Sequence, residues 1–191
     1  WGVLENLGQT LYGKTLGIIG MGRIGQALAR RALASGMNII YHNRERLPEN
    51  MELAYKAGKK ELPELLATSD VVSIHTPLTD ETRHLIGQAE LGKMKRTAIL
   101  VNTARGPVVD EKALAKALGD HQIFAAALDV YENEPDIAPG LLKLNNVVLA
   151  PHNGTATIEA RNEMSRFVAQ NIIRFFNGRT DISLVNRIPA D

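Results

Sequence analysis

The 191-residue sequence contains no cysteine, which excludes a disulfide framework, a thiolate metal site and a cysteine nucleophile. It also lacks any apolar run near the ~18 residues that a membrane-spanning helix requires, and its start does not resemble a signal peptide. The absence of cysteine is compatible with a reducing compartment. We therefore expect a cytoplasmic protein with no membrane partner.

An excess of charge of either sign is missing as well. The 22 lysines and arginines nearly balance the 21 aspartates and glutamates, for a formal net charge of +1, so we expect no nucleic-acid partner. No spacing of histidines and carboxylates resembles a metal motif, and we expect no metal site. A cluster of arginines near the C-terminus is interleaved with acids, which favours a solvated helix face over a phosphate-binding patch. This cluster contains Arg161, Arg166, Arg174 and Arg179, with Glu159 and Glu163.

The sequence does contain short apolar runs that alternate with longer amphipathic stretches. The runs lack an in-and-out alternation, which indicates strands buried on both faces. Helices between such strands indicate right-handed crossovers. We therefore predict an α/β fold, a doubly wound parallel sheet. The predicted strands cover residues 15–19, 38–41, 71–74, 98–101, 124–128 and 147–149, and the predicted helices cover 24–35, 61–68, 110–118 and 155–177.

A glycine motif joins the first predicted strand to the first predicted helix. In such a motif the first glycine permits a tight turn, the second lets the backbone approach a pyrophosphate, and the third lets helix and strand pack closely. The helix N–H groups then point at the anion. The alternative is a plain glycine-rich turn, but strand, loop, helix and strand in this order favour a dinucleotide-binding domain of the Rossmann type. The motif is Gly20-Met21-Gly22-Arg23-Ile24-Gly25.

The end of the second predicted strand lacks the acid that usually holds the ribose 2′-hydroxyl of NAD. Asn43 stands there instead, followed by Arg44 and Arg46 with Glu45 between them. An asparagine with nearby arginines can accept a 2′-phosphate through charge-assisted hydrogen bonds. We therefore expect NADP(H) to be preferred. The alternative is that the arginines only solvate a loop, in which case NAD is possible too.

Polar residues follow the other predicted strands, at the sheet edge where ligands bind in such folds. Three of them suit the reduction of a carbonyl group. His152 can give a proton to the developing alkoxide, Glu134 can orient that imidazole, and Arg105 can hold the carboxylate of a 2-oxo acid. Each also has a structural interpretation, as a strand-end histidine, a surface acid and a loop cation.

Other residues at this edge are expected to line the site, and the remaining histidines are not. His75 is interpreted as a lining residue rather than a catalyst. His42, His84 and His121 are expected to be surface or loop histidines without such partners. The further candidates for cofactor binding are Thr76, Pro77, Thr103, Ala104, Asp129 and Gly154.

Four ordered blocks together resemble the D-isomer-specific 2-hydroxyacid dehydrogenase family. In that family the catalytic arginine, glutamate and histidine fall on Arg105, Glu134 and His152, and an aspartate that contacts the nicotinamide carboxamide falls on Asp129. The asparagine–arginine pair after the second strand resembles glyoxylate and hydroxypyruvate reductases. Asn153 departs from the family pattern. The blocks are residues 13–25, 75–79, 101–106 and the stretch from Asp129 to Gly154.

The resemblance implies a domain organisation and partners. Residues 1–191 would form the NAD(P)-binding domain, with 1–12 and 179–191 as connections to a substrate domain outside this chain, so that the fragment alone would be inactive. The implied partners are a nicotinamide dinucleotide, a small 2-oxo or 2-hydroxy acid, and a second copy in a homodimer. Two alternatives stay open: an NAD(H)-binding corepressor-like module, or a family dehydrogenase acting on 3-phosphoglycerate, formate or phosphite.

Overall fold

The computed structural model describes residues 8–184. The chain divides into two compact units, one ending at His152 and the other beginning at Asn153.

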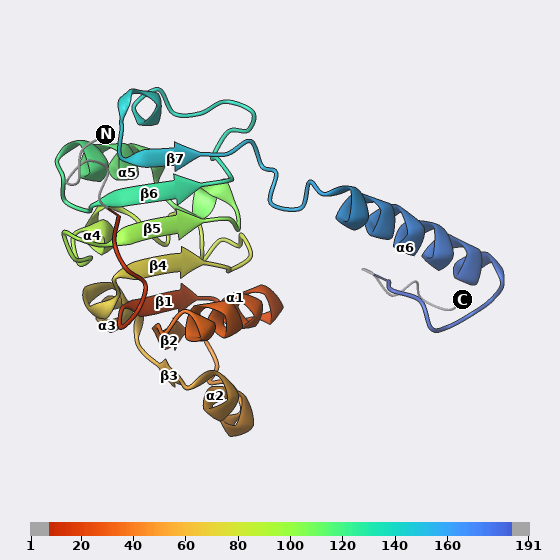
Figure 1. Ribbon diagram of the computed structural model, residues 1–191. Coiled ribbons are helices and arrows are strands. Elements are labelled where there is room, and N and C mark those ends of the chain that lie inside the picture. Colours follow the sequence, from red (N-terminus) through yellow and green to blue (C-terminus); the bar gives the residue numbers. More distant parts are fainter. Residues whose placement is uncertain (1–7, 185–191) are drawn as a thin grey trace. The chain divides into compact units, whose positions relative to one another are not determined.

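Seven parallel strands form one sheet in the first unit, and their arrows all point the same way in Figure 1. The strands are β1 (Thr15–Ile19), β2 (Asn38–His42), β3 (Ala57–Lys59), β4 (Val71–Ile74), β5 (Ile99–Asn102), β6 (Ala125–Leu128) and β7 (Val147–Leu149). Their order is β3-β2-β1-β4-β5-β6-β7. Because the chain builds outward from β1 in both directions, the predicted doubly wound parallel sheet is confirmed.

Helices connect the strands, and those predicted from periodicity differ from the observed ones by three residues at most. The α-helices are α1 (Arg23–Ala34), α2 (Glu49–Tyr55), α3 (Leu62–Thr68), α4 (Gln88–Leu91), α5 (Glu111–Gly119) and α6 (Ile158–Phe176), and the 3₁₀ turns are η1 (Gly106–Val108) and η2 (Leu141–Lys143). The elements β3, α2, α4 and both 3₁₀ turns were not predicted. They are short, and none of the residues of α2 is buried, so hydrophobic periodicity does not mark them.

Alternate residues of β1 face opposite layers of helices. Leu16 and Ile18 belong to a buried cluster that also holds Ala29 and Ala32 of α1. Ile19 belongs to a second cluster, with Leu65 and Leu66 of α3 and residues of β4, β5 and α5. Helices therefore cover both faces of the sheet, which explains why its strands are apolar without alternation. In Figure 1, α1 lies across β1 and β2.

Helix ends follow the expected chemistry of caps. Asp110 accepts a hydrogen bond from the N–H of Ala113 at the start of α5, at 3.0 Å. Gly36 follows α1 with a φ of +75°, the left-handed conformation in which glycine commonly ends a helix. The start of α1 differs, because its N-cap is Gly22 and no side chain in the described part of the chain caps it.

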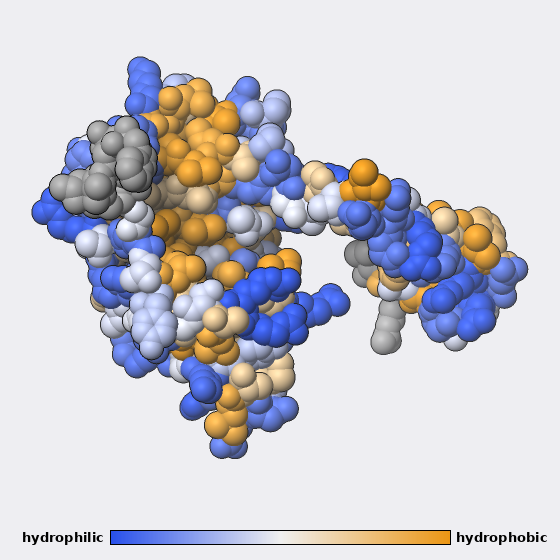
Figure 2. Space-filling model, in the orientation of Figure 1, coloured by the Kyte–Doolittle hydropathy of each residue, from blue (hydrophilic) through white to orange (hydrophobic). Residues whose placement is uncertain are grey.

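The second unit consists mainly of α6, whose N-cap Thr157 accepts a hydrogen bond from the N–H of Ala160. Apolar side chains on this helix are exposed, as the hydrophobic surface in Figure 2 shows, and charged residues lie between them. Within residues 8–184, no helix has both the length and the apolar character needed to cross a membrane.

Gly17 of β1 leaves no room for a side chain, so we predict that Gly17→Ala destabilises the fold. An added Cβ would overlap the hydroxyl of Ser69 and lie 2.7 Å from Leu65 Cδ2. Overpacking of this kind costs about 1–3 kcal/mol in the free energy of unfolding. Urea denaturation measures the loss. Gly58→Ala in β3 is the matched control, since its Cβ meets no described atom within 4 Å; equal losses in both variants would contradict the prediction.

Candidate functional site

The last residues of the neighbouring strands are aligned, so the segments that follow them leave the sheet at one edge. Ile19 of β1 pairs with His42 of β2 and with Ile74 of β4. The pairing continues to Asn102 of β5 and Leu128 of β6. Every residue proposed for the site in the first unit follows one of these strands or β7.

The glycine motif forms the turn between β1 and α1. Gly20 has a φ of +91°, and a Cβ there would lie 2.8 Å from the carbonyl carbon of His75 and from the N–H nitrogen of Thr76. Gly25 is equally constrained, because its Cβ would lie 2.7 Å from the carbonyl oxygen of Gly20. Only glycine fits at these two positions, which pack the turn against its neighbours.

Gly22 differs from the other two glycines because the space beside it is open. An added Cβ would meet no described atom within 4 Å. The first N–H groups of a helix have no partner within the helix, and here those of Arg23, Ile24 and Gly25 follow an N-cap without a side-chain acceptor. An open backbone beside uncapped N–H groups and the positive end of the helix dipole fits a pyrophosphate.

A cleft of about 750 Å³ adjoins this turn. The hydroxyl Oγ1 of Thr76 is buried and finds no hydrogen-bond partner within the described part of the chain, so it is a polar atom left over for a ligand. His75 Nε2 pairs with Ser73 Oγ at 2.9 Å, and burial lowers the pKa of His75, which favours the neutral ring. His42 was expected to be a surface or loop histidine, but it is the last residue of β2 and lines this cleft. The cleft is lined by Ile19, Gly20, Gly22, His42, Asn43, Arg44, Glu45, His75, Thr76, Pro77, Thr79, Glu81, Thr82 and Leu85.

Asn43 links the end of β2 to the glycine turn. Its Oδ1 accepts a hydrogen bond from the N–H of Met21 at 2.7 Å, and the side chain of Met21 is fully buried. This bond fixes the amide, whose N–H₂ group is then the donor that Asn43 can offer to a ligand. A donor suits a phosphate or a ribose hydroxyl acting as acceptor.

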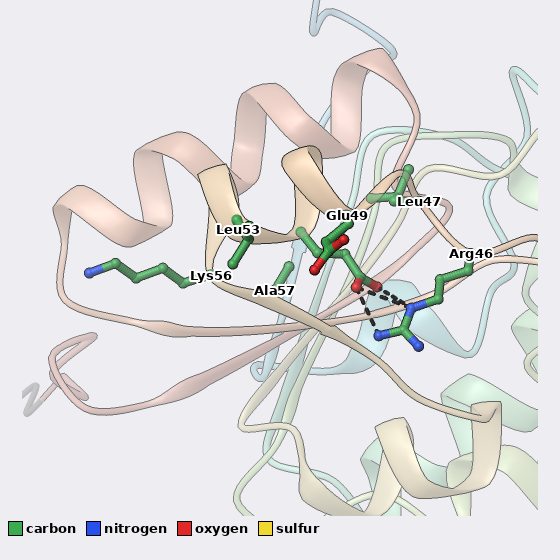
Figure 3. A pocket seen from close by; sticks show the side chains of 7 residues that line it. Arg46, Leu47, Glu49, Leu53, Lys56 and Ala57 are labelled. Carbon is green, nitrogen blue, oxygen red and sulfur yellow. Dashed lines mark hydrogen bonds and ion pairs between the residues drawn. The ribbon is translucent and has the colours of Figure 1, made fainter.

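The two arginines after β2 have different surroundings. Arg44 lines the cleft. The pKa of Glu81 is lowered mainly by a hydrogen bond from Thr79 and, to a smaller extent, by the charge of Arg44. Arg46 instead binds Glu52 of α2 through Nε and Nη2, at 3.1 and 2.9 Å from Oε2. Figure 3 shows Arg46 turned toward this carboxylate, in a second hollow beside Leu47 and Leu53. The structure therefore groups Arg44, but not Arg46, with Asn43.

The loop that carries Arg105 is shaped by the buried Asn102 at the end of β5. Asn102 Oδ1 accepts from the N–H of Ala104 at 3.1 Å, and its Nδ2 donates to the carbonyl of Arg105 at 3.0 Å. Thr103 and Arg105 are exposed at this loop. Gly106 then packs directly on the backbone of Tyr131, where a Cβ would overlap the carbonyl group. The loop is thus held against the segment after β6.

Glu134 and His152 form a direct pair. His152 Nδ1 lies 2.8 Å from Glu134 Oε2, and Glu134 Oε1 accepts from the N–H of Tyr131 at 3.0 Å. The hydrogen bond to His152 lowers the pKa of Glu134, with smaller contributions from the Tyr131 N–H and the charge of Arg105. Glu134 is therefore a carboxylate at neutral pH, and it fixes the orientation of the imidazole.

Tyr131 is a residue of this site that the sequence did not single out. Its backbone N–H holds Glu134, and its O–H donates to the carbonyl of Ala150 at 2.7 Å, two residues before His152. Tyr131 is 5% exposed. A buried tyrosine close to polar strand ends was the only available signal, and it is not specific.

A second acidic pair supports the same segment. Glu111 Oε1 accepts from the N–H of Glu132 at 2.6 Å, and Glu132 Oε1 accepts from the N–H of Glu111 at 2.8 Å. Burial raises the pKa of Glu111. Glu132 Oε2 also lies 3.1 Å from His84 Nε2, so the expectation that His84 lacks a partner was wrong. The spacing of 48 residues hides this contact in the sequence.

The remaining candidates lie at the same edge or in the second unit. Asp129 directly follows β6, is 8% exposed, and its N–H donates to the carbonyl of Asn102 at 3.0 Å. Pro77 lines the cleft. Gly154 belongs to the second unit and is exposed. Within residues 8–184, no three histidines and carboxylates gather in a way that could hold a metal ion.

Comparison with known proteins identifies close relatives. A glyoxylate reductase from Thermococcus gammatolerans is 54% identical over 187 residues, which is 98% of this chain and 56% of that protein. A glyoxylate reductase from Korarchaeum cryptofilum is 52% identical over 189 residues, with the same coverage. The chain therefore spans a little over half the length of these relatives.

Solved structures show the same fold. The crystal structure of a glyoxylate reductase from Paecilomyes thermophila matches with a TM-score of 0.84 and 51% identity, over 88% of this chain and 51% of that one. A D-lactate dehydrogenase with NAD+ from Lactobacillus jensenii matches with a TM-score of 0.86 and 30% identity, over 95% and 58%.

The family model that matches residues 1–154 is that of the D-isomer specific 2-hydroxyacid dehydrogenase, NAD binding domain. This match takes in the whole parallel sheet, the glycine turn and the segments that carry Arg105, Glu134 and His152. The chain belongs to the NAD-binding domain family of the D-isomer specific 2-hydroxyacid dehydrogenases.

Proposed function

We propose that residues 1–191 form the cofactor domain of a reductase that prefers NADP(H) and reduces small 2-oxo acids, glyoxylate or hydroxypyruvate, to D-2-hydroxy acids. The observation that carries this proposal is the 2.8 Å hydrogen bond between His152 and Glu134, at the sheet edge that also bears Arg105 and the cleft. The relatives named glyoxylate reductase support the choice of substrate.

In this proposal His152 is the proton donor. The nicotinamide, when bound, supplies a hydride to the carbonyl carbon of the substrate. His152 Nδ1 donates to Glu134, which leaves Nε2–H of the protonated ring to give its proton to the developing alkoxide. Glu134 keeps the ring in this orientation, and the exposed guanidinium of Arg105 binds the substrate carboxylate through two parallel N–H groups.

Asn43 and Arg44 carry the proposed preference for NADP(H). A 2′-phosphate brings a charge near −2 and several acceptor oxygens, which an amide donor and a guanidinium can satisfy. An aspartate or glutamate at position 43 would repel that group. Since the side chain of Arg44 lines the cleft and that of Arg46 binds Glu52, we assign the phosphate contact to Arg44.

The proposal extends to the complete protein. Residues 1–12 and 179–191 would connect this domain to a second one that completes the substrate site, and two copies would form a homodimer in the cytoplasm. The second domain and the homodimer rest on the resemblance to the family, and the cytoplasmic location rests on the composition of the sequence. The chain covers 56% of the length of the Thermococcus gammatolerans relative, so the remaining length of that relative is enough for a second domain.

We predict that Arg44→Ala weakens NADPH binding about 10- to 100-fold and leaves NADH binding nearly unchanged. Charge-assisted hydrogen bonds to a phosphate contribute about 1.5–3 kcal/mol, which corresponds to that range. Titration calorimetry on residues 1–191 measures both dissociation constants. The control is Arg30→Ala, which removes an exposed arginine of α1. Equal wild-type affinities for the two cofactors would remove the preference.

We predict that His152→Ala lowers kcat for glyoxylate reduction by the full-length protein about 10²- to 10⁴-fold, the usual contribution of a general acid. The measurement is steady-state reduction followed at the nicotinamide absorbance. His121→Ala, in an exposed loop after α5, should retain full activity. A loss smaller than about tenfold in His152→Ala would exclude the proton-donor role.

We predict that residues 1–191 alone bind NADPH but reduce glyoxylate at least about 100-fold more slowly than the full-length protein. Without a second domain the substrate loses much of its positioning, and misplaced reactants lose rate steeply. Binding is measured by titration calorimetry, and the rate of reduction by following the nicotinamide absorbance under single-turnover conditions. Comparable rates in the two proteins would show that this chain holds the whole substrate site.

A further inference from the structure

Arg46 is engaged by Glu52 rather than directed toward the cleft. Its Nε lies 3.1 Å from both carboxylate oxygens of Glu52, and its Nη2 lies 2.9 Å from Oε2. The dashed lines in Figure 3 mark these bonds. The arginine side chain is 71% exposed and the glutamate side chain 11% exposed, so an exposed cation meets a largely enclosed acid.

Tyr41 also holds Glu52 in place. The buried Tyr41 O–H donates to Glu52 Oε1 at 2.5 Å, and the N–H of Leu47 donates to the same hydroxyl oxygen at 2.9 Å. The hydrogen bonds from Arg46, and then from Tyr41, lower the pKa of Glu52, so this carboxylate is charged at neutral pH. The acceptor for Arg46 is therefore prepared by the fold.

We propose that Glu52 is a specificity-determining residue of the cofactor site, because it holds Arg46 away from the place of the 2′-phosphate. This inference rests on the proposed function, in which the loop after β2 receives that phosphate. Arg46 stands two residues from Arg44, and Glu45 between them lines the cleft. Glu52 and the phosphate thus compete for one guanidinium.

The competition has a definite direction. A guanidinium that moved to the phosphate would leave the Glu52 carboxylate, whose side chain is 11% exposed, with the hydrogen bond from Tyr41 but without its cation, which is costly for a partly enclosed acid. Arg46 therefore adds little to phosphate binding in the native protein. The preference for NADP(H) over NAD(H) is then weaker than it would be if both Arg44 and Arg46 bound the phosphate. Removing the charge of Glu52 should release Arg46.

The test is Glu52→Gln in residues 1–191. Glutamine keeps the size of the side chain and an oxygen that can accept from Tyr41, but it lacks the charge that holds Arg46. We expect the dissociation constant of NADPH to fall about tenfold and that of NADH to stay within about twofold. Both are measured by titration calorimetry, and thermal unfolding checks that the variant is folded.

Two controls separate the release of Arg46 from a general change of charge. Glu49→Gln removes an equal charge from the same helix, at a residue that influences Arg46 only at longer range. It should change the NADPH affinity less than twofold. In the double variant Arg46→Ala with Glu52→Gln, the gain should disappear, whereas Arg46→Ala alone should change NADPH binding little.

The outcomes distinguish this inference from the proposed function. If Arg44→Ala weakens NADPH binding but Glu52→Gln does not strengthen it, the inference is wrong and the cofactor preference stands. A gain that survives removal of Arg46, or that Glu49→Gln matches, also overturns it. If Arg44→Ala has no effect while Glu52→Gln acts through Arg46, the assignment of the phosphate to Arg44 is the part that fails.

Discussion

The register of the parallel sheet is the constraint on which the site depends. The final residues of β2, β1, β4, β5, β6 and β7 pair in one row, which consists of His42, Ile19, Ile74, Asn102, Leu128 and Leu149. The segments that follow them therefore meet at one edge although they are far apart in the sequence. A slip by one residue would turn every side chain of a strand to the opposite face of the sheet.

Backbone contacts between glycines and neighbouring loops fix the floor of the site. Gly20 packs on the backbone of His75 and Thr76, and Gly106 packs on that of Tyr131. Such contacts leave no space for a Cβ. The glycine turn and the Arg105 loop therefore pack against their neighbours as tightly as residues of the core do. Polar side chains then need few further contacts to be oriented, as Glu134 is by the Tyr131 N–H and by His152.

The sequence predicted those features that follow from local spacing. Apolar runs located six of the seven strands, and the glycine spacing located the turn before α1. The pairing of Arg46 with Glu52 and the two contacts of Tyr131 could not be predicted, because they depend on how α2 and the strand ends are placed in space. The three-residue β3 and the exposed α2 carry too little hydrophobic pattern to be found.

The hydrogen bond from the Met21 N–H to Asn43 Oδ1 has a consequence for how such proteins change in evolution. Aspartate has the same shape as asparagine and would offer the same oxygen to Met21, so the glycine turn would survive the exchange. If Asn43 contacts the nucleotide as proposed above, the exchange would change only the group offered to it, from an N–H donor to a charged acceptor. The two residues are separated by a single base change in the codon. Under the proposed assignment, one base change could therefore shift the preference between phosphorylated and unphosphorylated dinucleotides while the glycine turn keeps its hydrogen bond.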